Sequence, residues 1–206
     1  MNEPLIATNT SWDVIVVGSG ATGGVAAMTL SEGGCRVLVI EAGRNLTPEQ
    51  TFPGDLTNTI GRLRGISSGR HQRQAQHPGY WKNNPELYVD ERLHPYDHPD
   101  DQPFLWTQGQ QVGGRSLTWG GITLRLSDED FEGVSLDGTT QRWPIGSAEL
   151  TPHYDALEQF LGVHGAQDQL PHLPDGASAN PLPFTAAEQR FADQVEQRLG
   201  HRVIHA

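Results

Sequence analysis

The chain has 206 residues and a net charge of −11, from 25 acidic and 14 basic side chains. Only one base, Lys82, is a lysine, and the absence of a basic tract argues against nucleic acid as a partner. No apolar stretch reaches the ~18 residues that a membrane-spanning helix needs. Cys35 is the single cysteine, so no disulfide forms within the chain.

Residues 1–11, MNEPLIATNTS, lack the basic segment and the apolar core of a secretory signal. We interpret them as an N-terminal tail that leads into the first strand, and residues 12–206 as the N-terminal portion of one nucleotide-binding domain. The expected compartment is the cytoplasm, unless a partner protein carries an export signal.

The most regular stretch of the chain runs from Asp13 to Gly43. A run of mostly β-branched residues, 14–17, predicts a buried parallel strand. A G-x-G-x-x-G turn follows, then a helical pattern over roughly residues 22–32 and a second strand at 37–40. This order predicts an α/β fold with a Rossmann-like, parallel nucleotide-binding sheet.

Each conspicuous residue of this stretch has a physical role in holding a dinucleotide. Gly18 permits the tight turn, Gly20 lets the backbone approach a pyrophosphate, and Gly23 lets the helix pack against the strand. The helix N-terminus offers N–H groups and a partial positive charge to the phosphates. Glu41 ends the second strand, where a carboxylate accepts hydrogen bonds from ribose hydroxyls and repels the 2′-phosphate of NADP.

The match to a nucleotide signature extends beyond the glycines. The further matching positions are Ala27, Leu30, Gly34, Val37, Val39, Glu41, Ala42 and Gly43. Their spacing, close to the N-terminus, is more typical of the FAD-binding signature of flavoproteins than of the NAD signature. The pattern favours FAD, and an NAD-dependent dehydrogenase is the alternative.

From Arg44 to Gln111 the regular pattern disappears. Aromatic residues occur throughout this segment, so its composition is not that of a disordered chain. We interpret it as an extended excursion that packs on the domain surface, with a short helix at Thr57–Leu63. His94 and His98 have the i, i+4 spacing of a metal pair, but the adjoining prolines make a helix there implausible, so we expect no metal site.

A second glycine-rich stretch, residues 111–121, reads QVGGRSLTWGG. Glycine pairs let a backbone lie flat against a planar or phosphate-bearing ligand. A tight turn between two strands is an equally good interpretation of this pattern by itself.

The C-terminal part contains two helix-start patterns. Thr151-Pro152 is a good N-cap and first-turn pair. Thr185 and Glu188 form a capping box that starts a helix to about Leu199. Residues 202–205 then predict the first half of a strand. A return of this helix and strand to the nucleotide-binding sheet would make residues 46–184 one long excursion from it.

Three separated motifs carry a resemblance to a known family. The nucleotide unit, the VGGRSLTWGG stretch and the later Trp143-Pro144-Ile145 occur in the order typical of glucose–methanol–choline (GMC) oxidoreductases. The sequence LRLSDEDF, residues 124–131, resembles sequences of their bacterial sugar-dehydrogenase and pyranose-oxidase-like branch. The likeness covers most of the chain and is specific for the family rather than for a substrate.

The resemblance implies a set of cofactor-binding residues. Gly18, Ser19, Gly20, Thr22 and Gly23 would hold the FAD pyrophosphate, and Glu41 the adenosine ribose. The flavin side of the cofactor would be lined by six residues of the second glycine-rich stretch: Gly113, Gly114, Arg115, Ser116, Thr118 and Trp119. Some family members attach the flavin covalently through a histidine at the position of Thr118. Threonine cannot form that bond, so the expected cofactor is non-covalent FAD.

The resemblance further implies oxidation of an alcohol, with a sugar hydroxyl as the expected substrate, and a separate electron acceptor. The family's catalytic histidine lies near the end of a much longer chain, and no stretch here matches its motif. We therefore assign no catalytic residue. We expect the fold to be incomplete without further C-terminal sequence or a second chain. The alternative to an enzyme is a subunit without catalytic activity that binds a dinucleotide or serves in assembly.

Overall fold

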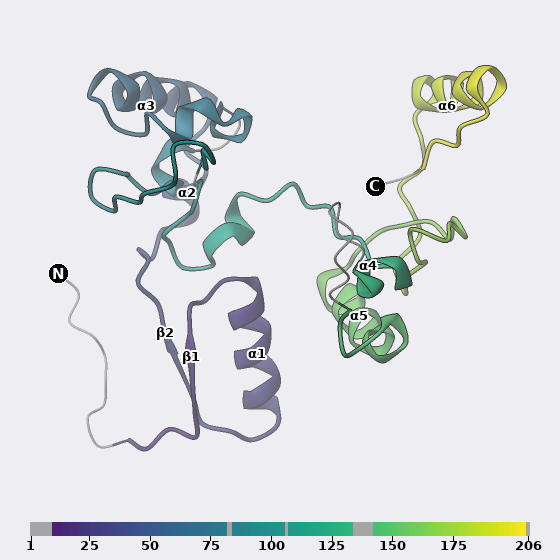
Figure 1. The fold of residues 1–206 in the computed structure, drawn as a ribbon, viewed down its shortest axis with the longest axis horizontal. Helices are drawn as coiled ribbons and strands as arrows, with labels where there is room; N and C mark the ends of the chain where they lie inside the picture. Colours follow the sequence, from purple (N-terminus) through teal and green to yellow (C-terminus); the bar gives the residue numbers. More distant parts are fainter. Residues whose placement is uncertain (1–9, 82–83, 106, 134–141, 205–206) are drawn as a thin grey trace. The chain divides into compact units, whose positions relative to one another are not determined.

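Figure 1 shows a computed structural model of the chain, which describes residues 10–81, 84–105, 107–133 and 142–204. The chain divides into two compact units, Met1–Gly120 and Gly121–Ala206. Among the helices of the described ranges, none combines the length and the apolar character needed to cross a membrane.

The first unit begins with the predicted strand–helix–strand order. Strands β1 (Val14–Val17) and β2 (Val37–Ile40) pair in parallel, with Val14 opposite Val37. Helix α1 (Ala21–Glu32) connects them. The α/β fold class and both strands are confirmed, and the helix starts at the end of the glycine turn as expected.

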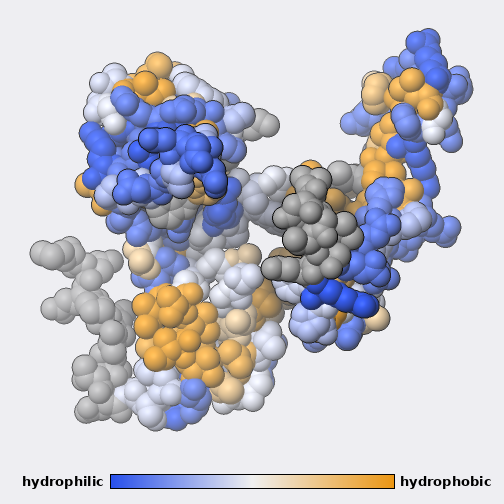
Figure 2. Space-filling model, viewed as in Figure 1, coloured by the Kyte–Doolittle hydropathy of each residue, from blue (hydrophilic) through white to orange (hydrophobic). Residues whose placement is uncertain are grey.

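The two faces of this small sheet differ. An ideal Cβ on Gly23 of α1 would lie 3.4 Å from Cγ1 of Val16, so α1 packs against the Val16 face. On the other face, Ile15, Val17 and Ile40 are 58%, 82% and 48% exposed. The space-filling view shows an apolar area over these strands (Figure 2). The sequence predicts buried strands, but in the described chain the side chains on one face of the two strands are exposed to solvent.

The excursion contains more regular structure than its composition indicates. Helix α2 (Pro48–Thr51) starts with a capping box, in which Thr47 N–H donates to Gln50 Oε1 at 2.9 Å. Helix α3 (Asp55–Ser67) includes the predicted Thr57–Leu63 helix but is longer at both ends. The described part of this unit also contains four short 3-10 helices: η1 (Gln74–Gln76), η2 (Pro78–Trp81), η3 (Pro85–Leu87) and η4 (Gly114–Leu117).

The core of the first unit lies in this excursion. Tyr80 and Leu87 are 0% and 2% exposed. Buried polar side chains satisfy the irregular backbone around them, because Gln74 Nε2 donates to Val89 O at 2.8 Å and Arg62 Nε donates to Tyr80 O at 3.2 Å. Side chains thus supply the hydrogen bonds that a sheet or helix would otherwise provide.

A buried carboxylate binds two arginines within the excursion. Asp90 is 7% exposed and accepts hydrogen bonds from Arg92 and from Arg70, whose Nε lies 3.1 Å from Oδ2. The Arg92 side chain, more than any other group, holds the pKa of Asp90 well below its usual range. The carboxylate therefore stays ionised although it is buried.

Within its described residues, the second unit contains three helices: α4 (Asp128–Glu132), α5 (Ser147–Leu161) and α6 (Ala186–Leu199). The predicted helix start at Thr151-Pro152 is wrong, because α5 begins at Ser147 and contains Pro152 in its interior. Glu149 caps the true start by accepting the Gly146 N–H at 2.8 Å. Pro152 lies close enough to the N-terminus to remove only one helical hydrogen bond.

A buried ion pair joins α5 to the irregular segment that contains Arg125. The Arg125 side chain is 8% exposed, and its Nε and Nη2 each lie 2.7 Å from a carboxylate oxygen of Glu158. Glu158 also accepts the Ala177 N–H at 2.7 Å. This bidentate pair therefore links three parts of the second unit.

The capping box before α6 is confirmed, since Thr185 Oγ1 accepts the Glu188 N–H at 3.3 Å. Gly200 ends the helix in the left-handed conformation. The strand predicted at residues 202–205 is wrong for Arg202–Ile204, which form no strand. A strand requires a hydrogen-bonding neighbour, and within the described residues β1 and β2 pair only with each other.

Candidate FAD site

Two of the three motif glycines are required by the chain itself. Gly18 has a φ of +91°, which only glycine adopts without strain, and its N–H donates to Ile40 O at 2.7 Å. A Cβ on Gly23 would lie 2.0 Å from Gly18 O. These contacts fold the turn tightly between β1, β2 and α1, as the sequence predicts.

Gly20 is different, because nothing in the chain requires a glycine there. Its φ of −64° and ψ of −176° are open to any residue, and a Cβ at this position meets no atom within 4 Å. The space in front of Gly20 lies at the N-terminus of α1, where helix N–H groups lack carbonyl partners. The turn therefore leaves a cradle that a pyrophosphate fits and a larger side chain would fill.

The carboxylate of Glu41 lies beside this turn. Its Oε2 accepts the Ser19 N–H at 2.8 Å and the Ser19 hydroxyl at 2.6 Å, and its Oε1 accepts the Gly43 N–H at 2.6 Å. The hydroxyl of Ser19, followed by these backbone N–H groups, lowers the pKa of Glu41 below its ordinary value. An ionised carboxylate is the state that accepts ribose hydroxyls and repels a 2′-phosphate.

The chain returns to this turn after the excursion. Arg44 and Gln111 form a parallel bridge, and a Cβ on Gly43 would lie 2.4 Å from the Gln111 nitrogen. Beyond it, the Gly113 N–H donates to Ser19 Oγ at 3.0 Å, and a Cβ on Gly114 would lie 3.4 Å from Gly20 Cα. The structure thus brings the first two residues of the predicted flavin-side stretch against the pyrophosphate turn.

The remaining flavin-side residues contact their own segment. Arg115 donates to the Thr107 carbonyl, and Ser116 donates to Gly113 O. The Thr118 hydroxyl lies 3.3 Å from Arg115 O, and Trp119 is 52% exposed. Thr22, in the first turn of α1, is exposed. The contact of these five residues with a cofactor stays a prediction.

Gln111 belongs to the site geometry but is not among the predicted residues. It is 1% exposed, and its Nε2 donates to Gly114 O at 2.7 Å, which fixes the turn that carries Gly113. Its Oε1 has no hydrogen-bond partner in the described chain. The available signal is Gly43, two residues after Glu41, whose missing side chain makes room for the Gln111 backbone.

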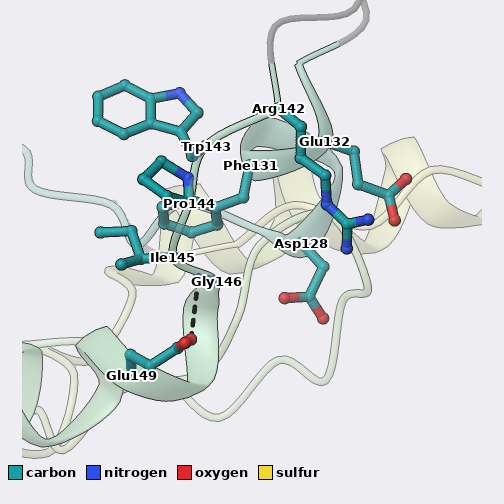
Figure 3. Close-up of a pocket in the computed structure, with 9 residues that line it drawn as sticks. All are labelled: Asp128, Phe131, Glu132, Arg142, Trp143, Pro144, Ile145, Gly146 and Glu149. Carbon is teal, nitrogen blue, oxygen red and sulfur yellow. Dashed lines mark hydrogen bonds between the residues drawn. The ribbon is translucent and has the colours of Figure 1, made fainter.

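A separate hollow of about 650 Å³ lies within the second unit. Trp143, Pro144 and Ile145, from the third family motif, line one side of it (Figure 3). Charged side chains, including Asp128 and Arg142, extend on the other side. None of the predicted cofactor residues lines this hollow.

The structure places the two spaced histidines outside regular helices. His94 follows a turn, and His98 Nδ1 lies 3.0 Å from Pro99 O. In the part of the chain that the structure describes, no group of three or more His, Cys, Asp or Glu residues is arranged to hold a metal ion.

Comparisons with known proteins agree with this geometry. A family model described as "FAD binding domain" matches residues 13–88, which include β1, α1, β2 and the start of the excursion. Paromamine 6'-oxidase of Streptomyces fradiae is 35% identical over 181 residues, covering 86% of this chain and 27% of that protein.

Two other relatives extend the comparison. The large subunit of fructose dehydrogenase of Gluconobacter japonicus is 25% identical over 205 residues, or 94% of this chain and 34% of that protein. Cholesterol oxidase of Mycobacterium tuberculosis is 30% identical over 152 residues, or 74% of this chain and 22% of that protein. The chain therefore spans about a third or less of the length of these relatives.

The glycine turn, the ionised Glu41 and the matched family model define an FAD-binding domain, and FAD is its cofactor. Most of the chain is similar to parts of these oxidases and this dehydrogenase, which agrees with the resemblance of its motifs to the N-terminal FAD-binding part of GMC oxidoreductases. The printed names of these relatives are those of two oxidases and a dehydrogenase subunit. The names of the three relatives cover sugar and sterol substrates, so the comparisons do not single out the sugar branch.

Proposed function

We propose that this chain supplies the FAD-binding part of an enzyme that oxidises a sugar hydroxyl to a carbonyl. The single observation that carries the proposal is the cradle at Gly20, which the chain leaves open next to an ionised Glu41. Two relatives whose names refer to fructose and to paromamine support a sugar-like alcohol as substrate. A separate electron acceptor and the cytoplasm remain the proposed partner and compartment.

The residues of this chain bind and orient the cofactor. Gly18, Gly20 and Gly23 shape the pyrophosphate cradle, and Glu41 fixes the adenosine ribose. Gly113 and Gly114 extend from the cradle toward the flavin end. Bound flavin supplies the hydride-accepting chemistry. The proton acceptor for the substrate hydroxyl lies, in our proposal, outside these 206 residues, because none of their histidines stands in a catalytic motif.

The cofactor is proposed to be held without a covalent bond. Thr118 has no ring nitrogen for attachment to a flavin methyl group. Acid precipitation of the purified holoprotein should therefore release all of the yellow colour into the supernatant. Flavin retained on the denatured polypeptide would contradict this part of the proposal and identify another attachment residue.

The test of the reaction is the visible spectrum of the purified protein under anaerobic conditions. Added sugars should bleach the flavin band, because hydride transfer to the flavin converts it to its reduced form. A bound flavin that no alcohol bleaches would favour the non-catalytic binding subunit. A protein without flavin that instead quenches or shifts NADH fluorescence would favour the NAD-dependent alternative.

A further inference from the structure

The hydroxyl of Ser19 occupies an unusual position between two ends of the proposed cofactor site. It donates to Glu41 Oε2 at 2.6 Å and accepts the Gly113 N–H at 3.0 Å. A serine hydroxyl has one proton to donate, and that proton is used on the carboxylate. Gly113 must therefore be the donor in the second bond, and the two bonds form a chain from Glu41 to Gly113.

This chain joins parts that are far apart in the sequence. Ser19 is separated by 22 residues from Glu41 and by 94 residues from Gly113. Glu41 marks the adenosine end of the proposed site, and Gly113 begins its flavin side. A hydroxyl that donates to a charged acceptor is polarised and becomes a better acceptor itself. The charge on Glu41 therefore strengthens the hydrogen bond that holds Gly113.

The hydroxyl of Ser19 bonds both Glu41 and Gly113, whereas its backbone N–H bonds Glu41 alone. Removal of the hydroxyl can therefore change the position of Gly113 without releasing Glu41. The Ser19 N–H donates to Glu41 Oε2 at 2.8 Å, so the carboxylate keeps a backbone partner when the hydroxyl is removed. Gly43 N–H also remains on Oε1. Loss of the hydroxyl thus frees Gly113 while Glu41 stays in place.

We propose that Ser19 is a positioning residue whose hydroxyl couples the ionised Glu41 to the flavin-side turn at Gly113. The proposal rests on the proposed FAD function, since it assigns the two coupled ends to adenosine and flavin. The turn at Gly113, on the flavin side, is thus held in position by the Glu41 carboxylate at the adenosine end of the cofactor.

The first test uses the flavin-free protein and needs no cofactor binding. Residue-resolved hydrogen exchange of the Gly113 amide would be compared in the wild type, Ser19→Ala, Glu41→Gln and the double variant. Either single change should speed exchange by about tenfold, and the double variant should exchange no faster than Ser19→Ala. Ser31→Ala, a serine change on the exposed far end of α1, is the matched control and should leave Gly113 unaffected.

The second test separates positioning from general damage. ADP carries the ribose and pyrophosphate but no flavin. Ser19→Ala should lower FAD affinity about tenfold more than it lowers ADP affinity. Ser19→Thr, which keeps a hydroxyl, should restore FAD affinity.

Additive effects on Gly113 exchange, or equal losses of ADP and FAD affinity in Ser19→Ala, would overturn the coupling. If the wild type itself bound no FAD, the proposed function would fail, but the exchange cycle in the flavin-free protein would still decide whether Glu41 holds Gly113 through Ser19.

Discussion

Two regions of the first unit show opposite relations between sequence pattern and packing. Residues 13–43, the nucleotide unit, carry the clearest pattern in the chain, yet the structure buries none of the residues of β1, α1 or β2 fully. Residues 51–90, the aromatic segment, carry almost no periodic pattern but bury Tyr80, His71 and Gln74 to 1% exposure or less. Periodicity therefore marks secondary structure, whereas long-range contacts between irregular pieces build the core.

The difference follows from what each region does. The nucleotide unit is shaped by backbone approaches, at Gly18 and Gly23, that leave a cradle free for a ligand. The aromatic segment fills its interior with rings and buried amides, such as Gln74, whose Nε2 donates to Val89 O. Stability and binding are therefore expected to respond to different residues.

The largest expected effect is on the aromatic core. Tyr80→Ala removes a fully buried ring and should lower the free energy of unfolding by about 3–5 kcal/mol. Ile15→Ala, on the open face of the sheet, should lower it by less than about 1 kcal/mol, because Ile15 is 58% exposed. Denaturant unfolding measures both. Equal losses of unfolding free energy in the two variants would mean that the Ile15 face of the sheet is covered in the whole protein. They would contradict the difference in packing between the two regions.

The sequence predicts the nucleotide unit well because its signals are local. Val14–Val17 and Val37–Ile40 are short β-branched runs next to glycines, and the Thr185 capping box likewise fixes the start of α6. The return of Gln111 to Gly43 could not be predicted, since it depends on how some 70 intervening residues fold.

Two helix errors have equally physical reasons. Helix α3 continues past the predicted end at Leu63 although glycine has a poor helix propensity, because Gly65 is buried where a Cβ would lie 3.4 Å from the His71 and Tyr80 side chains. Pro152 looked like a helix start, but α5 tolerates it one turn into the helix. A tertiary contact thus extends α3, whereas a local cap, the Gly146 N–H donated to Glu149, sets the start of α5.

A smaller effect is expected from the glycines of α1. Gly23→Ala should destabilise the protein by about 1–3 kcal/mol, because the new Cβ would lie 2.0 Å from Gly18 O and α1 must move. Gly24→Ala is the matched control. Its Cβ would meet only Ser19 O, at 4.0 Å, so the helix should gain about 0.5–1 kcal/mol. Thermal unfolding of the pair distinguishes close packing from mere glycine content.

The smallest effect is a pH response that separates the two regions. Burial lowers the pKa of His71 below its ordinary 6.5, so the unfolded chain binds more protons. The stability of the aromatic segment should therefore fall as pH drops below 6.5 toward the folded-state pKa of His71. Glu41, whose pKa is lowered from 4.5, stabilises the nucleotide unit until pH falls below that value.

Hydrogen exchange at about pH 7.5 and about pH 5.5 tests this difference. Exchange corrected for its intrinsic pH dependence should speed up in the aromatic segment and stay constant in the nucleotide unit. His71→Asn should remove the response, since asparagine does not titrate and tolerates the φ of 55° at this position. A parallel loss in both regions would contradict the assignment to His71.

The central claim, that the Gly20 cradle holds the FAD pyrophosphate, is tested most directly by FAD titration of two variants. In Gly20→Val the added side chain meets no protein atom within 4 Å at its Cβ, so the fold should persist while the cradle is filled. Flavin fluorescence quenching should show FAD affinity reduced by at least about tenfold in Gly20→Val and unchanged in Gly24→Ala. Wild-type FAD affinity in a folded Gly20→Val protein would contradict the claim.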